Sequence, residues 1–185
     1  MRWTRFDQGC DRGRANSVDW FFFENGNGYS FSMAERVTVF FYGLFMDPEG
    51  LEAKGLRPAN VRQAYIERFA LRLGDRATLL ADPDGRVYGT TATLTHGELD
   101  RLFSGPSVAA YRPEPVLVQF ANGTAELALC FNLPTISQAK TTNPSYAADL
   151  RAVARKMGLP ESYVASIGKQ GVRAMAPSRD AGSAS

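Results

Sequence analysis

The stretch VTVFFYGLFMD, from Val37 to Asp47, most constrains the fold of this 185-residue chain. It begins with an unbroken run of β-branched and aromatic residues that ends at Tyr42. A run without polar alternation predicts a strand that is buried on both faces. Gly43 then permits a sharp turn and leaves room for a ligand near the backbone amides, where an anion can bind. The alternative is a core strand that ends in an ordinary turn.

The composition and charge exclude several classes of protein. The chain carries 21 Lys and Arg against 19 Asp and Glu, and these cations are scattered among the acids, so we expect no nucleic-acid partner. No apolar run is long enough to span a membrane, and the N-terminus lacks the order of a signal peptide. Cys130 lies in an apolar pattern far from Cys10, which favours a reduced thiol and a cytoplasmic location. The single histidine, His96, cannot form a histidine-based metal site, so we expect no metal or other cofactor.

Three segments differ in composition. Residues 1–32 hold eight of the 21 aromatic residues without a sustained period of 2 or 3.6, and Met33 precedes the first well-patterned strand. We therefore expect an N-terminal extension at 1–32, either disordered or upstream of the true start, and a folded domain at 33–168. The alternative for 1–32 is an extra hairpin packed on the domain. Residues 169–185, rich in Gly, Ser and Ala, predict a flexible tail.

Turn residues divide the middle of the chain into strands. Asp82-Pro83-Asp84-Gly85 has proline and glycine where a tight turn requires them, and Asn122-Gly123 favours a two-residue hairpin. We expect strands at residues 37–42, 64–73, 77–81, 86–93, 115–120 and 124–131.

The helices begin at recognisable caps. Asp47 and Asn143 each precede a proline, which is typical of an N-cap followed by the first helical turn. Thr95 and Glu98 form the pattern of a capping box. A run of strands with short helices inserted, and the longest helix near the end, predicts an α+β fold with a largely antiparallel, barrel-like sheet.

An ordered series of short motifs from about Val37 to Ile167 resembles the gamma-glutamylcyclotransferase-like superfamily. The series consists of Phe40-Phe41-Tyr42-Gly43-Leu44-Phe45, Arg86-Val87-Tyr88-Gly89, the helix at Glu98 to Leu102, Tyr111-Arg112, Asn122-Gly123, Tyr146 and Leu159-Pro160-Glu161-Ser162-Tyr163. The resemblance implies a small mixed, mostly antiparallel β-barrel with flanking short helices. It also implies cyclisation of γ-glutamyl amines or peptides to 5-oxoproline.

The resemblance further implies a binding site and a partner. The site would comprise Tyr42, Gly43, Leu44, Phe45, Tyr88 and Tyr111, and the partner would be a small molecule with a free amino-acid head group. A glutamate in a Glu-Gly pair before Tyr111 would act as general acid and base. The sequence predicts no oligomeric state.

This chain departs from the pattern at the catalytic position. Where the resemblance places the glutamate, the sequence reads Ser104-Gly105-Pro106-Ser107, and Phe131 replaces a tyrosine of many relatives. Glu98 is the fourth residue of the predicted capping box, which engages its carboxylate. Glu114, between two prolines, is our candidate catalytic residue because that rigid position can aim a carboxylate into the barrel mouth. The alternative for Glu114 is a solvated acid paired with Arg112.

Two functional hypotheses follow. The first is a cyclotransferase with a displaced acid. The second is a non-catalytic relative that binds a small amino-acid or γ-glutamyl metabolite. The sequence leaves open whether the protein is an enzyme.

Overall fold

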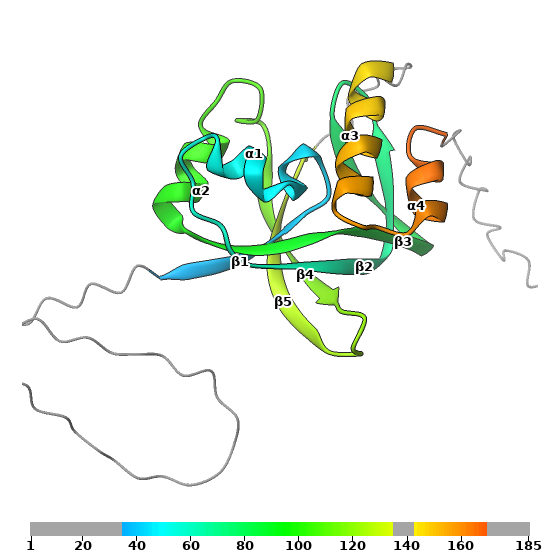
Figure 1. The fold of residues 1–185 in the computed structure, drawn as a ribbon, viewed down its shortest axis with the longest axis horizontal. Helices are drawn as coiled ribbons and strands as arrows, with labels where there is room; N and C mark the ends of the chain where they lie inside the picture. The colour runs from blue at the N-terminus through cyan, green and yellow to red at the C-terminus, as the bar shows by residue number, and fades with distance from the viewer. Residues whose placement is uncertain (1–34, 135–142, 170–185) are drawn as a thin grey trace, which may run out of the picture. The chain divides into compact units, whose positions relative to one another are not determined.

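The computed structural model describes residues 35–134 and 143–169 (Figure 1). In these residues the strands close into a barrel in the order β1–β3–β2–β4–β5, and short helices lie around it. All strand pairs are antiparallel except β1 with β5, which is parallel. The predicted α+β fold with a mixed, mostly antiparallel barrel is therefore confirmed. The elements are β1 (Arg36–Phe41), the 3₁₀ helix η1 (Leu44–Met46), α1 (Pro48–Glu52), β2 (Ala59–Leu73), β3 (Ala77–Thr95), α2 (His96–Phe103), β4 (Arg112–Gln119), β5 (Ala125–Asn132), α3 (Pro144–Lys156) and α4 (Glu161–Ser166).

Strand β1 lies between β3 and β5, which explains its continuous apolar sequence. Val39, Phe40 and Phe41 are buried, and Val39 and Phe40 have partners on both neighbouring strands. The predicted start of α1 is also confirmed, since the Asp47 carboxylate accepts a hydrogen bond from the Glu49 N–H at 3.1 Å. The opening stretch thus forms the strand, turn and helix start that its residues predict.

The predicted turn at Asp82–Gly85 does not reverse the chain, and this part of the strand prediction was wrong. The segments on either side of it belong to one strand, β3, and both pair with β2. Phe69 pairs with Ala81 and Glu67 pairs with Arg86, so Asp82–Gly85 lies opposite Arg68 as a bulge. The reversal occurs at residues 74–76, between β2 and β3. Local turn chemistry is compatible with a bulge as well as a hairpin, and the pairing with β2 decides between them.

Most of the remaining local predictions agree with the structure. Strands β4 and β5 form a hairpin around Asn122-Gly123, but the predicted two-residue turn was wrong, because the strand pairing ends at Gln119 with Ala125 and only Gly123 of the two has a positive φ, 81°. The Asn143 side chain accepts from the Tyr146 N–H at the start of α3. Thr95 and Glu98 form the complete capping box of α2. The Glu98 carboxylate also accepts a hydrogen bond from the Arg57 N–H at 2.7 Å, so both of its roles here are structural.

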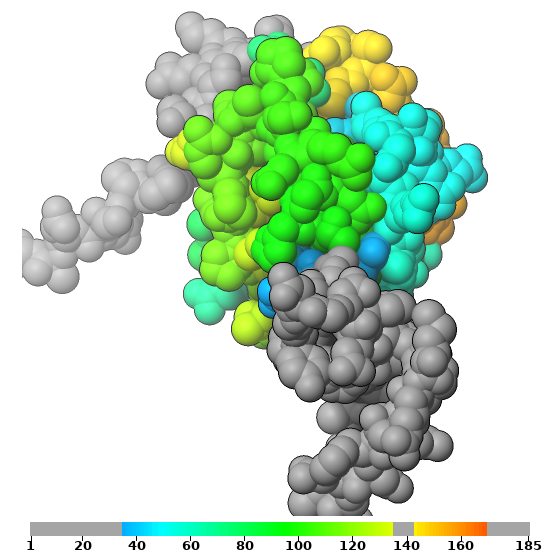
Figure 2. Space-filling view, turned by 90° about the vertical axis from the view of Figure 1, so that its left-hand side faces the viewer, coloured from blue at the N-terminus to red at the C-terminus, as the bar shows by residue number. Residues whose placement is uncertain are grey.

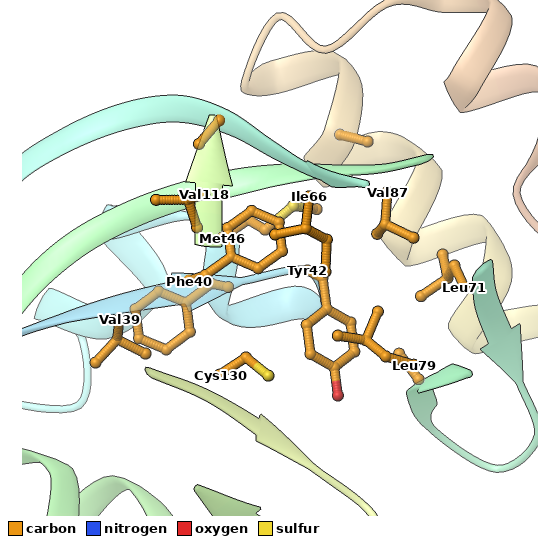
Figure 3. Close-up of a cluster of buried hydrophobic side chains, with 14 of the residues drawn as sticks. Val39, Phe40, Tyr42, Met46, Ile66, Leu71, Leu79, Val87, Val118 and Cys130 are labelled. Atoms are coloured by element: carbon orange, nitrogen blue, oxygen red, sulfur yellow. The ribbon is translucent and has the colours of Figure 1, made fainter. Parts of the chain in front are cut away.

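The core fills the barrel and continues beneath α3 and α4. Figure 3 shows Phe40, Tyr42 and Cys130 among aliphatic side chains of the surrounding strands. Each fully buried large side chain contributes roughly 1.5–3 kcal/mol of transfer free energy. Cys130 is a buried free thiol. Side chains of the strands thus pack together inside the barrel.

The predicted extension at 1–32 lies outside the described residues, as does the predicted tail at 169–185 apart from Lys169. None of the helices in the described ranges is long and apolar enough to cross a membrane.

Candidate functional site

A cavity of about 90 Å³ lies where β1 ends and the chain turns into η1. Aromatic side chains form most of its wall, and its polar groups are phenol hydroxyls and one guanidinium. The lining residues are Phe40, Phe41, Tyr42, Gly43, Leu44, Phe45, Arg76, Ala77, Phe103, Val108, Tyr111, Phe131 and Tyr146. Five of the six binding residues expected from the resemblance are therefore brought together, namely Tyr42, Gly43, Leu44, Phe45 and Tyr111.

The turn after β1 is held by backbone and side-chain hydrogen bonds. The Met46 N–H donates to the Gly43 carbonyl at 3.0 Å, and the Thr90 hydroxyl donates to the Met46 carbonyl at 3.1 Å. A Cβ atom at Gly43 would lie 3.1 Å from the hydroxyl of Tyr146. A larger residue here would press on the Tyr146 hydroxyl and require a small shift of that side chain, while the φ of Gly43, −114°, is an ordinary one.

Tyr146 engages the amides of this turn. Burial raises the pKa of its hydroxyl, while hydrogen bonds to the backbone of Ala77 and Leu44 and the charge of Arg76 act to lower that pKa. A backbone hydrogen bond that lowers the pKa of a phenol is one that an N–H donates to the phenol oxygen. Leu44, whose amide we expected to meet a ligand directly, therefore lies beside a protein hydroxyl that itself lines the cavity.

Tyr42 connects the cavity to a buried polar network. Its hydroxyl donates to the Phe131 carbonyl at 2.8 Å and lies 3.2 Å from Oδ1 of Asn132. Asn132 Oδ1 also accepts from the Thr78 hydroxyl at 2.6 Å and the Leu79 N–H at 2.9 Å. Burial raises the pKa of Tyr42 far above its usual value. This phenol is consequently a fixed neutral group.

Glu114 lies on the far side of Asn132 from Tyr42. Asn132 Nδ2 donates to the Glu114 carboxylate at 3.4 Å and to the Leu79 carbonyl at 3.1 Å. Glu114 is half-buried in β4 and is not among the residues that line the cavity. Arg112 donates instead to the carbonyls of Ala109 and Tyr111. The structure thus places our candidate acid beside the site, connected to it through an amide.

Aromatic rings surround Phe103, the residue before the segment at which the resemblance would place a catalytic glutamate. The Phe103 ring stacks on Phe131, and it also contacts Phe45 and Tyr111 with centroids 6.1 Å and 6.4 Å away. Ser104, the next residue, is exposed, and its hydroxyl donates to the Arg101 carbonyl. The position that lacks the acid therefore faces away from the cavity, and a phenyl ring fills the space beside it.

Tyr88 belongs to a different cluster. Its ring lies 5.6 Å from that of Tyr65 and 5.2 Å from that of Tyr163, measured between centroids. It is not among the residues that line the cavity. Its place in the binding set rested on the resemblance alone.

Eight of the 13 lining residues lie outside the predicted site, and Arg76, Phe103 and Tyr146 are among them. Arg76 is the last residue of the β2–β3 reversal, and its relation to the β1 turn depends on the closure of the barrel. Tyr146 had a usable signal, because it lies one turn after a clear N-cap on the longest helix.

A second, more polar hollow adjoins the first. It is lined by Phe45, Lys54, Leu56, Arg101, Leu102, Ser104, Gly105, Ser107 and Val108. Figure 2 shows the face of the molecule on which α2, in green, adjoins the α1 segment, in cyan. Phe45 and Val108 line both hollows, so they separate this hollow from the aromatic cavity.

No cluster of three or more His, Cys, Asp or Glu side chains suited to a metal ion exists in the part of the chain that the structure describes.

Comparisons with known proteins bear on the fold. No protein-family model and no curated protein matches the sequence. Among solved structures, a gamma-glutamyl cyclotransferase superposes with a TM-score of 0.62 and 20% identity, covering 82% of this chain and 94% of that one. Human uncharacterized protein loc79017 gives a TM-score of 0.62 and 20% identity over 72% and 86% of the two chains. YkqA from Bacillus subtilis superposes with a TM-score of 0.60 and 20% identity, covering 72% of this chain and 53% of that one. The expected fold is therefore confirmed: this chain shares the fold of that gamma-glutamyl cyclotransferase structure.

Proposed function

We propose that this protein binds a small molecule in the aromatic cavity and does not cyclise γ-glutamyl compounds. The observation that carries this proposal is the set of lining residues, which contains phenols and a guanidinium but no carboxylate. Concave sites of mostly aromatic walls with a few convergent polar groups are typical of small-molecule sites.

Cyclisation requires a base that the cavity does not supply. In that reaction the α-amine nitrogen bonds to the γ-carbonyl carbon, the bond to the departing amine breaks, and a proton passes from the ammonium to that amine. The group that moves this proton has to lie within hydrogen-bond reach of it and have a pKa near the working pH. Burial raises the pKa values of Tyr42, Tyr111 and Tyr146, and it raises the pKa of the Cys130 thiol to about 12. These groups stay protonated at neutral pH.

The cyclotransferase reaction is the second candidate, and one observation favours it. Glu114 reaches the cavity through Asn132, which contacts both the Glu114 carboxylate and the Tyr42 hydroxyl. A movement of Asn132 would open a path from this carboxylate to a bound substrate. The fold shared with a gamma-glutamyl cyclotransferase supports this candidate as well.

One experiment separates the two candidates. The full-length chain is incubated at high concentration with γ-glutamyl amines, γ-glutamyl amino acids and glutathione, and both 5-oxoproline and the melting temperature are measured. We expect ligand-dependent stabilisation by at least one small molecule and no 5-oxoproline above the protein-free control. Sustained 5-oxoproline release that Glu114→Gln abolishes would instead establish the cyclotransferase. Glu52→Gln, which removes an exposed acid on α1, is the matched control for the change in charge.

A further inference from the structure

The polar side of the aromatic cavity consists of hydrogen-bond donors. Arg76 lines it, and within residues 35–134 and 143–169 its guanidinium makes no hydrogen bond and no ion pair. Arg76 lines the same cavity as Tyr111 and Tyr146, and its charge acts to lower the pKa of both phenols. An arginine without a partner at the wall of a cavity is a ready site for a planar anion.

Tyr146 extends this donor set. Its hydroxyl lines the cavity and donates to no acceptor among the residues that the structure describes. Tyr111, in contrast, already donates to the Ala77 carbonyl at 2.6 Å. The free proton of Tyr146 can therefore be donated to a ligand that Arg76 also holds.

The rest of the cavity offers a cation the faces of aromatic rings but no carboxylate. The remaining side chains are apolar apart from Tyr42, whose proton is donated to the Phe131 carbonyl. An ammonium group placed here would be close to the Arg76 charge and would lose its hydration without gaining a carboxylate, which is strongly unfavourable. A zwitterionic amino-acid head group is therefore a poor match for this wall.

From these contacts we infer that the cavity takes a small apolar monocarboxylate without an ammonium group, whose carboxylate pairs with Arg76 and accepts from the Tyr146 hydroxyl. This inference rests on the binding function proposed above and replaces the amino-acid head group expected from the resemblance. A cavity of about 90 Å³ accommodates roughly six to nine groups the size of a water molecule. The part of the ligand that enters the cavity is therefore a short branched or cyclic acid.

A matched set of three probes tests the ligand class. The set is 4-methylpentanoate, leucine, which adds an α-ammonium to the same carbon skeleton, and 4-methylpentanamide, which removes the negative charge. Binding to the full-length chain is measured at neutral pH by titration calorimetry and by thermal shift. We expect 4-methylpentanoate to bind roughly tenfold or more tightly than either of the other two, as is typical of a charge-assisted contact. Equal or tighter binding of leucine or of the amide overturns the inference.

Two variants and a control test the contacts. Arg76→Gln is expected to weaken binding of 4-methylpentanoate roughly tenfold and to leave binding of 4-methylpentanamide unchanged. Tyr146→Phe keeps the ring and is expected to weaken binding of 4-methylpentanoate by a smaller factor. Arg101→Gln removes the same charge from the neighbouring hollow and is expected to change nothing. Carboxylate binding that survives Arg76→Gln, or that is lost in Arg101→Gln, refutes the assignment to Arg76.

The outcome for the ligand class is separable from the outcome for the proposed function. If a γ-glutamyl compound or leucine binds and 4-methylpentanoate does not, this inference fails while small-molecule binding stands. If 5-oxoproline is released, the proposed function fails. The inference about the ligand class is then still decided by whether 4-methylpentanoate binds and whether Arg76→Gln weakens that binding. If none of the molecules binds, both are overturned.

Discussion

The rings of Phe103 and Phe131 lie parallel, with centroids 3.7 Å apart and an interplanar angle of 8°. Phe103 ends α2 and Phe131 lies near the end of β5, so this pair connects the helix to the barrel beside the cavity. The pair has two consequences. It fills the cavity wall with two apolar rings, and it makes the shape of the cavity dependent on one aromatic contact.

Phe103→Ala is expected to lower the free energy of unfolding by about 2–4 kcal/mol and to enlarge the cavity, because a half-buried ring is replaced by a methyl group. Urea denaturation gives the stability, and binding of bulkier carboxylates gives the change in volume. Phe103→Leu, which keeps most of the apolar volume, is expected to cost less than half as much. Equal losses for both variants would show that the aromatic contact itself, and not the volume, is decisive.

Asn132→Leu is expected to lower the free energy of unfolding by about 2–4 kcal/mol, because the Leu79 amide and the Thr78 hydroxyl lose a buried acceptor. Thr78→Val removes only the hydrogen bond from the Thr78 hydroxyl to the Asn132 side chain and is expected to cost about 1 kcal/mol. Chemical denaturation of the two variants and their combination measures the coupling. Strictly additive effects would contradict the view of Asn132 as the centre of one network.

Glu98 is expected to make stability depend on pH. Burial acts to raise the pKa of Glu98, but hydrogen bonds from the Thr95 and Arg57 amides and the Thr95 hydroxyl outweigh it, so the pKa is lowered overall. Because the folded state favours the ionised form, the contribution is fully present above the unfolded pKa, about 4.3, and is lost as pH falls through the lower folded value. The difference in unfolding free energy between wild type and Glu98→Gln should therefore shrink on acidification. A difference that grows towards low pH would mean that the sign is wrong.

Two glycines offer a matched pair of substitutions to alanine. A Cβ at Gly89 would overlap the Phe41 carbonyl oxygen, so Gly89→Ala is expected to cost at least about 3 kcal/mol or to prevent folding. A Cβ at Gly97, in the first turn of α2, would meet nothing within 4 Å, so Gly97→Ala is expected to stabilise by about 0.4–1 kcal/mol. Melting temperatures of the two proteins provide the test. A well-folded Gly89→Ala protein would show that β1 and β3 can separate locally.

The local structure could be predicted from the sequence wherever it depends on contacts between residues that are close together in the chain. Asp47, Asn143 and Thr95 satisfy amides within a few residues of themselves, so their helix starts are visible in the sequence. The Asn122-Gly123 hairpin is visible for the same reason. The turn at Asp82–Gly85 was wrong because its residues suit a bulge equally well, and only the β2 partner selects between the two.

In the candidate site, too, only the contacts between residues adjacent in sequence could be predicted. Tyr42, Gly43, Leu44 and Phe45 form one continuous segment, so the sequence by itself determined that they would meet, and it also revealed the absence of a glutamate before Tyr111. The tertiary structure alone decided that Arg76 and Tyr146 join them and that Tyr88 does not. Those contacts depend on closure of the barrel between β1 and β5 and on where α3 packs, which are relations between residues far apart in the chain. The charge of the cavity, and with it the kind of ligand it can hold, is set by that packing.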